Sequence, residues 1–197
     1  MGSPRTRDAW ERLIAPIGRA TRLPPRLLAH LPERGTLLDI GAGSGRMART
    51  IAAARPELNI IGVDTVIQPD AAIPVIPFDG RRLPFADGCF QTVMLIDVLH
   101  HDRDPAALLG EAARVCRGTV LVKDHYWRTR LDRWVLRRSD DMGNAGLGIA
   151  LPHTYLRLSE WRALFAATGL KVETRETFHY SLLDRCKQVI FAAVKSG

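Results

Sequence analysis

An α/β fold with a mostly parallel sheet is predicted by three observations on this sequence of 197 residues. From Gly35 onward, short apolar runs alternate with helix-like segments, which is typical of parallel strands joined by helices. A glycine-rich turn, Gly41–Gly45, separates the first run from the first helix, and aspartates follow several runs. Since the chain has seven such runs and the length of one domain, we expect a seven-stranded sheet with helices on both faces.

The first four strands and the first connecting helix are expected before residue 98. Each strand is a run of aliphatic and β-branched residues, which favour strands, and turn-forming residues bound it. The Asp87-Gly88 turn and the polar cluster His100–Asp104 limit the fourth strand. The expected strands are Thr36–Ile40, Asn59–Asp64, Ile73–Pro77 and Thr92–Asp97, with a helix at Arg46–Ala54.

The second half continues the alternation and closes with an antiparallel hairpin. A helix is expected at Pro105–Cys116, because proline suits a first helical turn and Gly118 follows the end. Ser159 as N-cap and Gly169 as a stop predict another helix between them. The remaining elements are that helix at Glu160–Thr168, a fifth strand at Thr119–Lys123 and the hairpin strands Leu170–Thr177 and Gln188–Val194.

Charge and cysteine content limit the classes of function. The chain has 28 Lys and Arg against 21 Asp and Glu, and this net charge of +7 favours anionic partners. Cys89, Cys116 and Cys186 are widely spaced without a C-x-x-C pair, so neither a disulfide framework nor a zinc site is expected. Neither a signal peptide nor a run of about 20 apolar residues is found, so a cytoplasmic protein is expected.

The strongest motif is Asp39-Ile40-Gly41-Ala42-Gly43-Ser44-Gly45, which directly precedes a helix. Glycines let the backbone approach a ligand closely, and a helix N-terminus points N–H groups at that ligand. The dinucleotide fingerprint requires G-x-G-x-x-G, but Arg46 occupies the position of its third glycine. The turn therefore predicts a compact ligand without a pyrophosphate, with the Asp39 carboxylate beneath the loop.

Further acidic positions follow this turn in a regular order. Asp64 ends the second strand in Gly62-Val63-Asp64, Asp79 follows the third in Phe78-Asp79-Gly80, and the fourth strand runs on to His101. With the D-x-G-x-G-x-G turn, this order resembles the class I S-adenosylmethionine-dependent methyltransferases over residues 36–122, and more weakly in the final helix and hairpin. The resemblance implies a Rossmann-like sheet, S-adenosyl-L-methionine as cofactor and methyl transfer. Gln91 departs from the pattern, because the family commonly has Asp there.

The resemblance also implies how the cofactor is bound. A carboxylate about 20 residues past the glycine turn is placed to accept two hydrogen bonds from a ribose diol, which assigns Asp64 to the ribose. Asp79 would accept the adenine amino hydrogen, and the amide of Gly80 or Arg81 would meet a ring nitrogen. Thr65 and Val66 would pack on one face of the adenine. Asp39 would stabilise the methionine ammonium. The expected cofactor-binding residues are Asp39, Gly41, Ala42, Gly43, Gly45, Asp64, Thr65, Asp79, Gly80 and Ile96.

The exit of the fourth strand holds the candidate catalytic residues, Asp97 and His101. Transfer of an activated methyl group requires a nucleophile held in line with the methyl–sulfur bond, and a base only if that nucleophile is protonated. His101 would take the proton and Asp97 would orient a donor group or the cofactor ammonium. The alternative is that His100 and His101 cap the loop. No metal site is expected, since adjacent histidines lack the i, i+4 spacing of a helix-borne site.

Two segments lie outside the alternation, and both are too short for a second domain. The expected organisation is one domain over residues 1–197. It comprises a helical cap at 1–34, with helices at Asp8–Gly18 and Arg26–Leu31, a cofactor-binding half at 35–124, a lid insertion at 125–158 and a final helix and hairpin at 159–197. Additions at strand ends complete ligand pockets in α/β proteins. The basic excess is concentrated in the cap and in residues 123–138.

The segment Trp127–Arg138 is predicted to be an amphipathic basic helix. Its apolar residues would cover the acceptor as a lid, would contact a membrane surface beside its arginines, or would simply pack on the core. The glycines of Gly143–Gly148 would let a loop move as a gate, and this loop would bring further polar groups to the acceptor. Those polar groups are His125, Tyr126, His153 and Tyr155.

Methyl transfer to a small acceptor, anionic or lipid-like, is the function that these features favour. An RNA methyltransferase is the first alternative, supported by the charge and disfavoured by the absence of an N-P-P-[FY] motif after the fourth strand. A non-catalytic partner protein that binds S-adenosylmethionine is the second. The acceptor atom and the oligomeric state are left open.

Overall fold

The structure is a computed structural model, and it describes residues 18–143, 152–180 and 184–196. The predicted helix at Asp8–Gly18 lies outside the described residues apart from its last position, and the predicted gate lies outside them apart from Gly143. The elements in chain order are α2 (Arg19–Leu28), β1 (Arg34–Ile40), α3 (Arg46–Ala54), β2 (Glu57–Asp64), β3 (Val75–Pro77), β4 (Phe90–Ile96), the 3₁₀ turn η2 (Leu99–His101), α4 (Pro105–Val115), β5 (Cys116–His125), α5 (Arg130–Gly143), α6 (Leu158–Ala167), β6 (Leu170–Phe178) and β7 (Gln188–Lys195).

Seven strands form one sheet in the order β3-β2-β1-β4-β5-β7-β6, which confirms the predicted fold class. The pairs from β3 to β5 are parallel, whereas β7 runs antiparallel to both of its neighbours. Because β1 to β5 point the same way, their carboxyl ends meet at one edge, and the strand order reverses between β1 and β4. A sheet of this kind binds ligands at that edge, beside that switch point.

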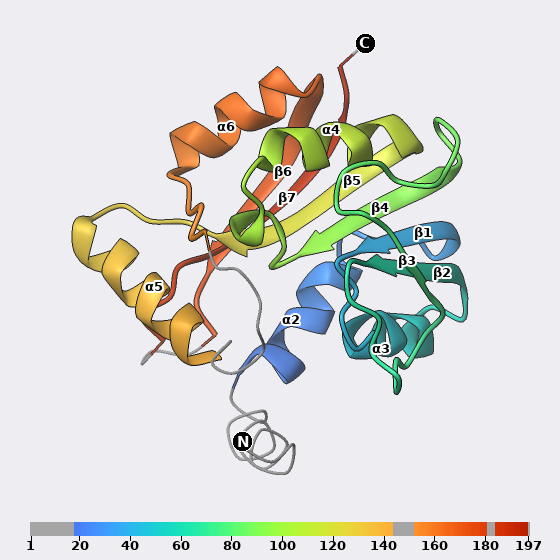
Figure 1. The fold of residues 1–197 in the computed structure, drawn as a ribbon, viewed down its shortest axis with the longest axis horizontal. Helices are drawn as coiled ribbons and strands as arrows, with labels where there is room; N and C mark the ends of the chain where they lie inside the picture. The colour runs from blue at the N-terminus through green and yellow to red at the C-terminus, as the bar shows by residue number, and fades with distance from the viewer. Residues whose placement is uncertain (1–17, 144–151, 181–183, 197) are drawn as a thin grey trace.

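Helices cover both faces of the sheet, with α4 and α6 on one side and α2 and α3 on the other (Figure 1). Alternate residues of a strand point to opposite faces, so Leu38 joins the core under α4 and α6 while Leu37 joins the core under α2 and α3. Each face therefore has its own hydrophobic core. The sheet between the two cores is a rigid support for loops at its carboxyl edge.

The N-terminal helix differs from its prediction. It spans Arg19–Leu28 and includes Pro24 and Pro25, whereas the sequence pattern places its start after these prolines. Proline removes a backbone donor and is disfavoured inside a helix. Here Leu23, Pro24 and Leu27 are buried against the sheet and α3, so tertiary packing outweighs the local preference.

The basic helix also begins later than predicted, at Arg130 instead of Trp127. The Thr129 hydroxyl accepts from the Asp132 amide (3.2 Å), and the Asp132 carboxylate accepts from the amides of Arg128 (2.9 Å) and Thr129 (3.0 Å). This reciprocal cap starts the helix after Thr129. Trp127 therefore lies outside α5, and its indole N–H donates to the Tyr155 carbonyl (2.9 Å).

Smaller shifts affect other element ends. The helix α6 begins at Leu158, because Arg157 and Glu160 form the capping box in place of Ser159. The strand β5 begins directly at Cys116 and runs to His125, so it is longer at both ends than predicted. The strand β4 ends at Ile96, and Asp97 follows it with a positive φ of 59°.

Candidate active site

The glycine turn between β1 and α3 has the conformation that its sequence demands. Gly41, Gly43 and Gly45 have φ values of 71°, 54° and 68°, a region that side chains disfavour. A Cβ at Gly41 would lie 2.5 Å from a Val98 methyl, and one at Gly45 would lie 2.7 Å from the Ile73 side chain. At Gly43 the nearest atom to an added Cβ is 3.7 Å away. The turn is thus packed behind its first and last glycines and more open at its middle one.

Asp64 at the end of β2 holds this turn in place. One carboxylate oxygen accepts from the Gly43 amide (2.7 Å) and the other from the Val66 amide (3.0 Å). The amides of Gly41 and Ala42 donate to the Val63 carbonyl, so the turn is bound to β2 at several points. The structure therefore brings Asp64 against the glycine turn, and its half-buried carboxylate keeps lone pairs for a diol.

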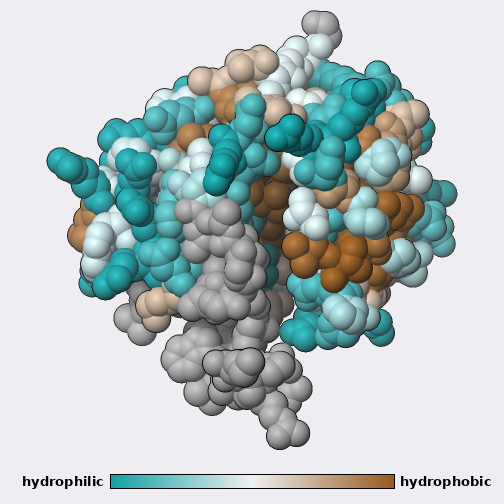
Figure 2. All heavy atoms as spheres, in the orientation of Figure 1, coloured by the Kyte–Doolittle hydropathy of each residue, from teal (hydrophilic) through white to brown (hydrophobic). Residues whose placement is uncertain are grey.

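Asp79 follows β3 at the same edge of the sheet. It is exposed, and one of its oxygens accepts from the amides of Arg81 (2.8 Å) and Arg82 (2.9 Å), which lowers the pKa of Asp79. A Cβ at Gly80 would lie 3.2 Å from the Thr65 methyl, so the loops after β2 and β3 meet. Figure 2 shows hydrophobic atoms on the surface over this part of the sheet, where Val66, Ile67 and Ile76 are exposed.

Asp39 lies near the end of β1, and only 3% of the residue is exposed. Burial raises its pKa to about 7, the nearby Asp64 adds to this effect, and Arg19 opposes it. A buried carboxyl of this kind favours a cation beside it. The methionine ammonium of S-adenosylmethionine supplies such a cation, so the charge of this site and the glycine turn both fit that cofactor.

Asp97 is locked in an ion-pair network at the end of β4. Its carboxylate contacts the ammonium of Lys123, which is completely buried, and accepts from the Arg19 guanidinium (2.9 Å). Burial raises the pKa of Asp97, but Lys123 and Arg19 outweigh burial and hold it far below its usual range. Asp97 is therefore ionised at neutral pH and orients cationic groups; it cannot take up a proton there.

Histidines from several elements gather beside Asp97. His100 and His101 lie on η2, with ring centroids 4.0 Å apart, and His125 ends β5. His153 approaches from the segment before α6, and Tyr155 stacks on His100 with centroids 5.1 Å apart. The polar groups that the sequence pattern assigned to the acceptor loop thus reach the exit of β4, except that Tyr126 is buried in the core.

The inner part of this group is a buried pair. His100 Nδ1 is 2.6 Å from Asp124 Oδ1, and the exposed fractions of the two side chains are 3% and 0%. Burial lowers the pKa of His100, but the Asp124 carboxylate outweighs burial and raises it. Burial lowers the pKa of His101, and the neighbouring His100 lowers it further. His101 is the more accessible of the two, with a quarter of its side chain exposed.

Sequence reasoning missed four residues of this region: Arg19, Lys123, Asp124 and Asp140. Lys123-Asp124 directly follows the apolar part of β5, and polar residues at the carboxyl end of a parallel strand are a signal for a site. Arg19 and Asp140 carry no such signal, because α2 and α5 reach the sheet edge only through tertiary packing.

Gln91 lies at the start of β4, where its backbone amide donates to the Thr36 hydroxyl (3.0 Å), so its departure from the family pattern does not affect the cofactor site.

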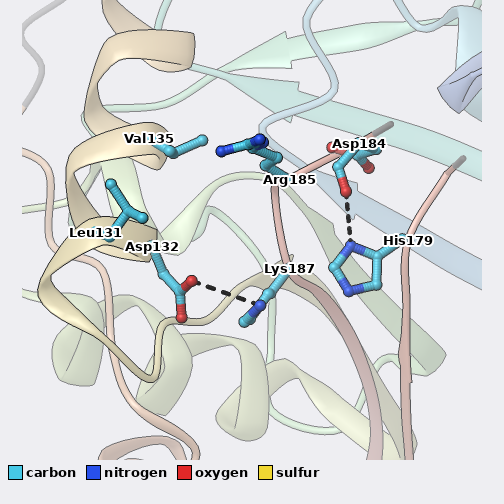
Figure 3. Close-up of a pocket in the computed structure, with 7 residues that line it drawn as sticks. All are labelled: Leu131, Asp132, Val135, His179, Asp184, Arg185 and Lys187. Carbon is cyan, nitrogen blue, oxygen red and sulfur yellow. Dashed lines mark hydrogen bonds and ion pairs between the residues drawn. The ribbon is translucent and has the colours of Figure 1, made fainter. Parts of the chain in front are cut away.

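The helix α5 lies beyond the carboxyl end of β5, beside the histidines (Figure 1). Leu136 is its buried apolar residue, whereas Leu131 and Trp134 are 60% and 58% exposed. Leu131 and Trp134 of the predicted apolar stripe are therefore open to solvent, so these two residues do not pack on the core. Between α5 and the β6–β7 connection lies a cavity of about 260 Å³ (Figure 3). Its lining residues are Leu131, Asp132, Val135, His179, Asp184, Arg185 and Lys187.

Within the residues that the structure describes, no helix combines the length and the apolar character needed to cross a bilayer.

The sheet order, the glycine turn and the acidic residues at the strand ends together define a class I methyltransferase fold. Residues 10–175 match the methyltransferase domain family, and the chain belongs to that family. It is a domain of the type that uses S-adenosylmethionine.

Similarity to individual proteins is lower. The chain is 28% identical to the 27-O-demethylrifamycin SV methyltransferase of Amycolatopsis mediterranei, over 85% of this chain and 66% of that protein. It is 27% identical to a phosphatidylethanolamine N-methyltransferase of Cereibacter sphaeroides, over 64% and 69% of the two chains. The chain thus spans about two thirds of the length of these relatives.

Among solved structures, a similar fold is found in the 1,6-didemethyltoxoflavin-N1-methyltransferase of Burkholderia thailandensis with bound 1,6-didemethyltoxoflavin and S-adenosylhomocysteine. The TM-score is 0.71 at 14% identity, over 100% of this chain and 92% of that one. At this identity the similarity concerns the fold alone.

Proposed function

We propose that this protein transfers the methyl group of S-adenosylmethionine to a small, lipid-like acceptor in a single in-line displacement. In the cofactor the methyl group is bonded to a positively charged sulfur. When a nucleophile attacks the methyl carbon, that sulfur leaves as part of a neutral thioether. The observation that carries the proposal is the position of the glycine turn and Asp39 directly beside the polar exits of β4 and β5. The names of the two relatives above give 27-O-demethylrifamycin SV and phosphatidylethanolamine as their acceptors, which supports a small or lipid acceptor.

The binding roles follow from where each residue lies. Asp39 would hold the methionine ammonium, and the open side of Gly43 would admit the methionine chain. Asp64 would bind the ribose diol with the lone pairs that the Gly43 and Val66 amides leave unused. Asp79 would meet the adenine. The other proposed contacts are Gly41, Ala42, Gly45, Thr65, Gly80 and Ile96, all in these turns or at the end of β4.

Asp97 and His101 are proposed to act at the reacting atoms. Asp97 stays ionised between Lys123 and Arg19, so its role would be to orient the donor rather than to move a proton. His101 is the partly exposed histidine of η2 and would assist the removal of the proton that an acceptor hydroxyl loses. As the new carbon–oxygen bond forms, the carbon–sulfur bond breaks and the thioether departs.

The open face of α5 supports an acceptor drawn from a lipid surface. Leu131, Trp134 and Met142 are exposed on one face of this helix, and exposed arginines flank them. A helix with apolar and aromatic residues on one face and arginines beside it is suited to the interface of an anionic membrane. We propose that α5 contacts such a surface in the cytoplasm, where the three described cysteines stay free.

Cofactor specificity is the first test of this function. We expect saturating S-adenosylmethionine to raise the melting temperature of the protein, because a ligand that binds only the folded state stabilises it. NAD should give no shift, and Asp64→Ala should reduce the shift with S-adenosylmethionine by most of its size. Glu57→Ala at the start of β2, far from the carboxyl edge, is the matched control. A shift with NAD alone would overturn the proposal.

A further inference from the structure

Three histidines surround one carboxylate next to the proposed acceptor position. Asp140 comes from α5, and its Oδ1 atom lies 3.9 Å from His100 Nε2 and 3.7 Å from His101 Nε2. Its Oδ2 atom lies 3.4 Å from His153 Nδ1. These side chains are largely buried, with exposed fractions of 3% for His100, 25% for His101, 10% for Asp140 and 13% for His153. The ligand atoms of His100, His101 and Asp140 all lie within 4.8 Å of one another.

The spacing of these atoms suits an ion between them. Tetrahedral Zn²⁺ with ligand bonds of about 2.0 Å separates its ligand atoms by roughly 3.3 Å, so closing the present distances needs only small side-chain movements. A second group, His100 with Asp124 and His125, is less suitable, because His100 Nδ1 and Asp124 Oδ1 are only 2.6 Å apart and already hydrogen-bonded.

That hydrogen bond is itself an argument for the first group. A histidine that binds a metal through one ring nitrogen usually donates from the other to a carboxylate, which fixes the tautomer and the ring orientation. His100 has this arrangement, because Nδ1 faces Asp124 and Nε2 faces Asp140. Asp124 is held in turn by the amides of His100 (3.3 Å) and His125 (2.6 Å), so the ring is rigidly placed.

Incomplete hydrogen bonding gives a third, independent observation. In the described part of the chain, the buried Nδ1 atoms of His101 and His153 have no hydrogen-bond partner. Buried polar atoms are nearly always paired, and exceptions mark missing ions, waters or functional groups. The unpartnered Nδ1 of His153 already faces Asp140, because it lies 3.4 Å from Oδ2 of that carboxylate.

We propose that His100, His101 and Asp140 bind a divalent transition-metal ion such as Zn²⁺, with Asp124 as the outer partner of His100. Two imidazoles and one carboxylate are a common ligand set of catalytic zinc and leave a position open. The spacing of His100, His101 and Asp102 argues against a helix-borne metal site, but sequence spacing cannot reveal Asp140, which α5 brings to η2.

The consequence for the reaction rests on the proposed function. An acceptor hydroxyl at the open position would be acidified by the metal and would release its proton to solvent near neutral pH. Its oxygen would then attack the methyl carbon, forming a carbon–oxygen bond as the carbon–sulfur bond breaks. In this arrangement His101 would act through the metal that it helps to hold and would not itself take up the proton. Such a site would favour acceptors whose O–H group the metal can acidify, such as phenols.

Metal binding is measured on the untagged full-length protein after treatment with a chelator. Calorimetric titration with Zn²⁺, and visible absorption with Co²⁺ as a spectroscopic probe, should show one saturable equivalent. Asp140→Asn and His101→Ala should each weaken binding at least tenfold. His30→Gln is the matched control, because His30 lies near Glu176 and away from this cluster, and it should bind like the wild type.

Two results would overturn the proposal: no stoichiometric binding by the wild type, or equal binding by His101→Ala and the wild type. If Asp140→Asn fails to fold, as circular dichroism would show, the partly exposed His101 still decides the question. The shift in melting temperature with S-adenosylmethionine is recorded on the same samples. A protein that binds this cofactor but not the metal would reject the metal site and leave the proposed function standing.

Discussion

Asp39 shows how one residue links folding to cofactor binding. In the folded protein burial raises its pKa to about 7, compared with 3.8 for a free aspartate. The folded state therefore favours the protonated carboxyl. The stability from this preference is fully present below about pH 4 and is lost as the pH rises to about 7. A cation beside Asp39 favours the ionised carboxylate instead, and the methionine ammonium would be such a cation.

Replacing Asp39 by asparagine (Asp39→Asn) should remove this pH dependence of the free energy of unfolding. Between pH 4 and pH 7 the free energy of unfolding of the wild type should fall relative to that of the variant, by on the order of 4 kcal/mol at most. Urea unfolding at several pH values measures the difference, and other titrating groups cancel between the two proteins. Parallel curves for the two proteins would show that Asp39 titrates normally.

The same residue should control cofactor affinity. Binding by the wild type should weaken from pH 8 to pH 6, because the ammonium must first displace a proton from Asp39. The Asn variant should bind more weakly and with little change over this range. Isothermal titration with S-adenosylmethionine tests both statements, and a wild-type affinity that does not vary with pH would contradict them.

Among the elements, the predicted strands and helices of the sheet agree closely with the structure, whereas the helices of the two additions begin at other residues than predicted. A buried parallel strand needs an apolar run, and a glycine or proline bounds it, so the local pattern is informative. The helix α2 instead includes two interior prolines, and α5 starts at a cap that a single threonine and aspartate form. In the sequence, the prolines of α2 and the cap of α5 are less evident than the apolar periodicity. A sequence-based assignment, which depends on that periodicity, therefore misplaces the starts of both helices.

Two exposed residues of α5 provide a test of its proposed contact with a membrane. Replacing Leu131 and Trp134 by serine should leave the free energy of unfolding within about 0.5 kcal/mol of the wild-type value, because both are mostly exposed. It should reduce co-sedimentation with vesicles of phosphatidylcholine and phosphatidylglycerol several-fold.

Leu136→Ala is the contrasting variant of the same helix. Leu136 is 2% exposed, so its truncation should cost about 2 kcal/mol or more of stability. Vesicle binding by the folded variant should stay near the wild-type level. If the serine variant unfolds as readily as Leu136→Ala, the stripe packs on the protein and the membrane proposal fails.

For the whole molecule, the net charge of +7 raises the alternative of an RNA substrate. We expect labelled methyl groups to enter lipid and small hydroxyl compounds and not RNA when the protein is incubated with separate cell fractions. Affinity for bulk RNA should be weak at physiological salt, because non-specific contacts to phosphates weaken steeply as the salt concentration rises. Labelling of the RNA fraction would favour the alternative. Cofactor binding without labelling of any fraction would favour a non-catalytic partner protein.

The order of strands and helices, the glycine turn and the aspartates that we propose to bind the cofactor could be predicted from the sequence, because all depend on residues close together in the chain. Backbone conformation, apolar periodicity and the exits of parallel strands are local properties that a short pattern contains. The proposed catalytic region is different. Arg19, Lys123, Asp124 and Asp140 meet Asp97 and the histidines across large separations in sequence, and their burial and ion pairs exist only in the folded chain. Long-range packing leaves no local pattern for Arg19 and Asp140, so only the tertiary structure places these two residues in the site.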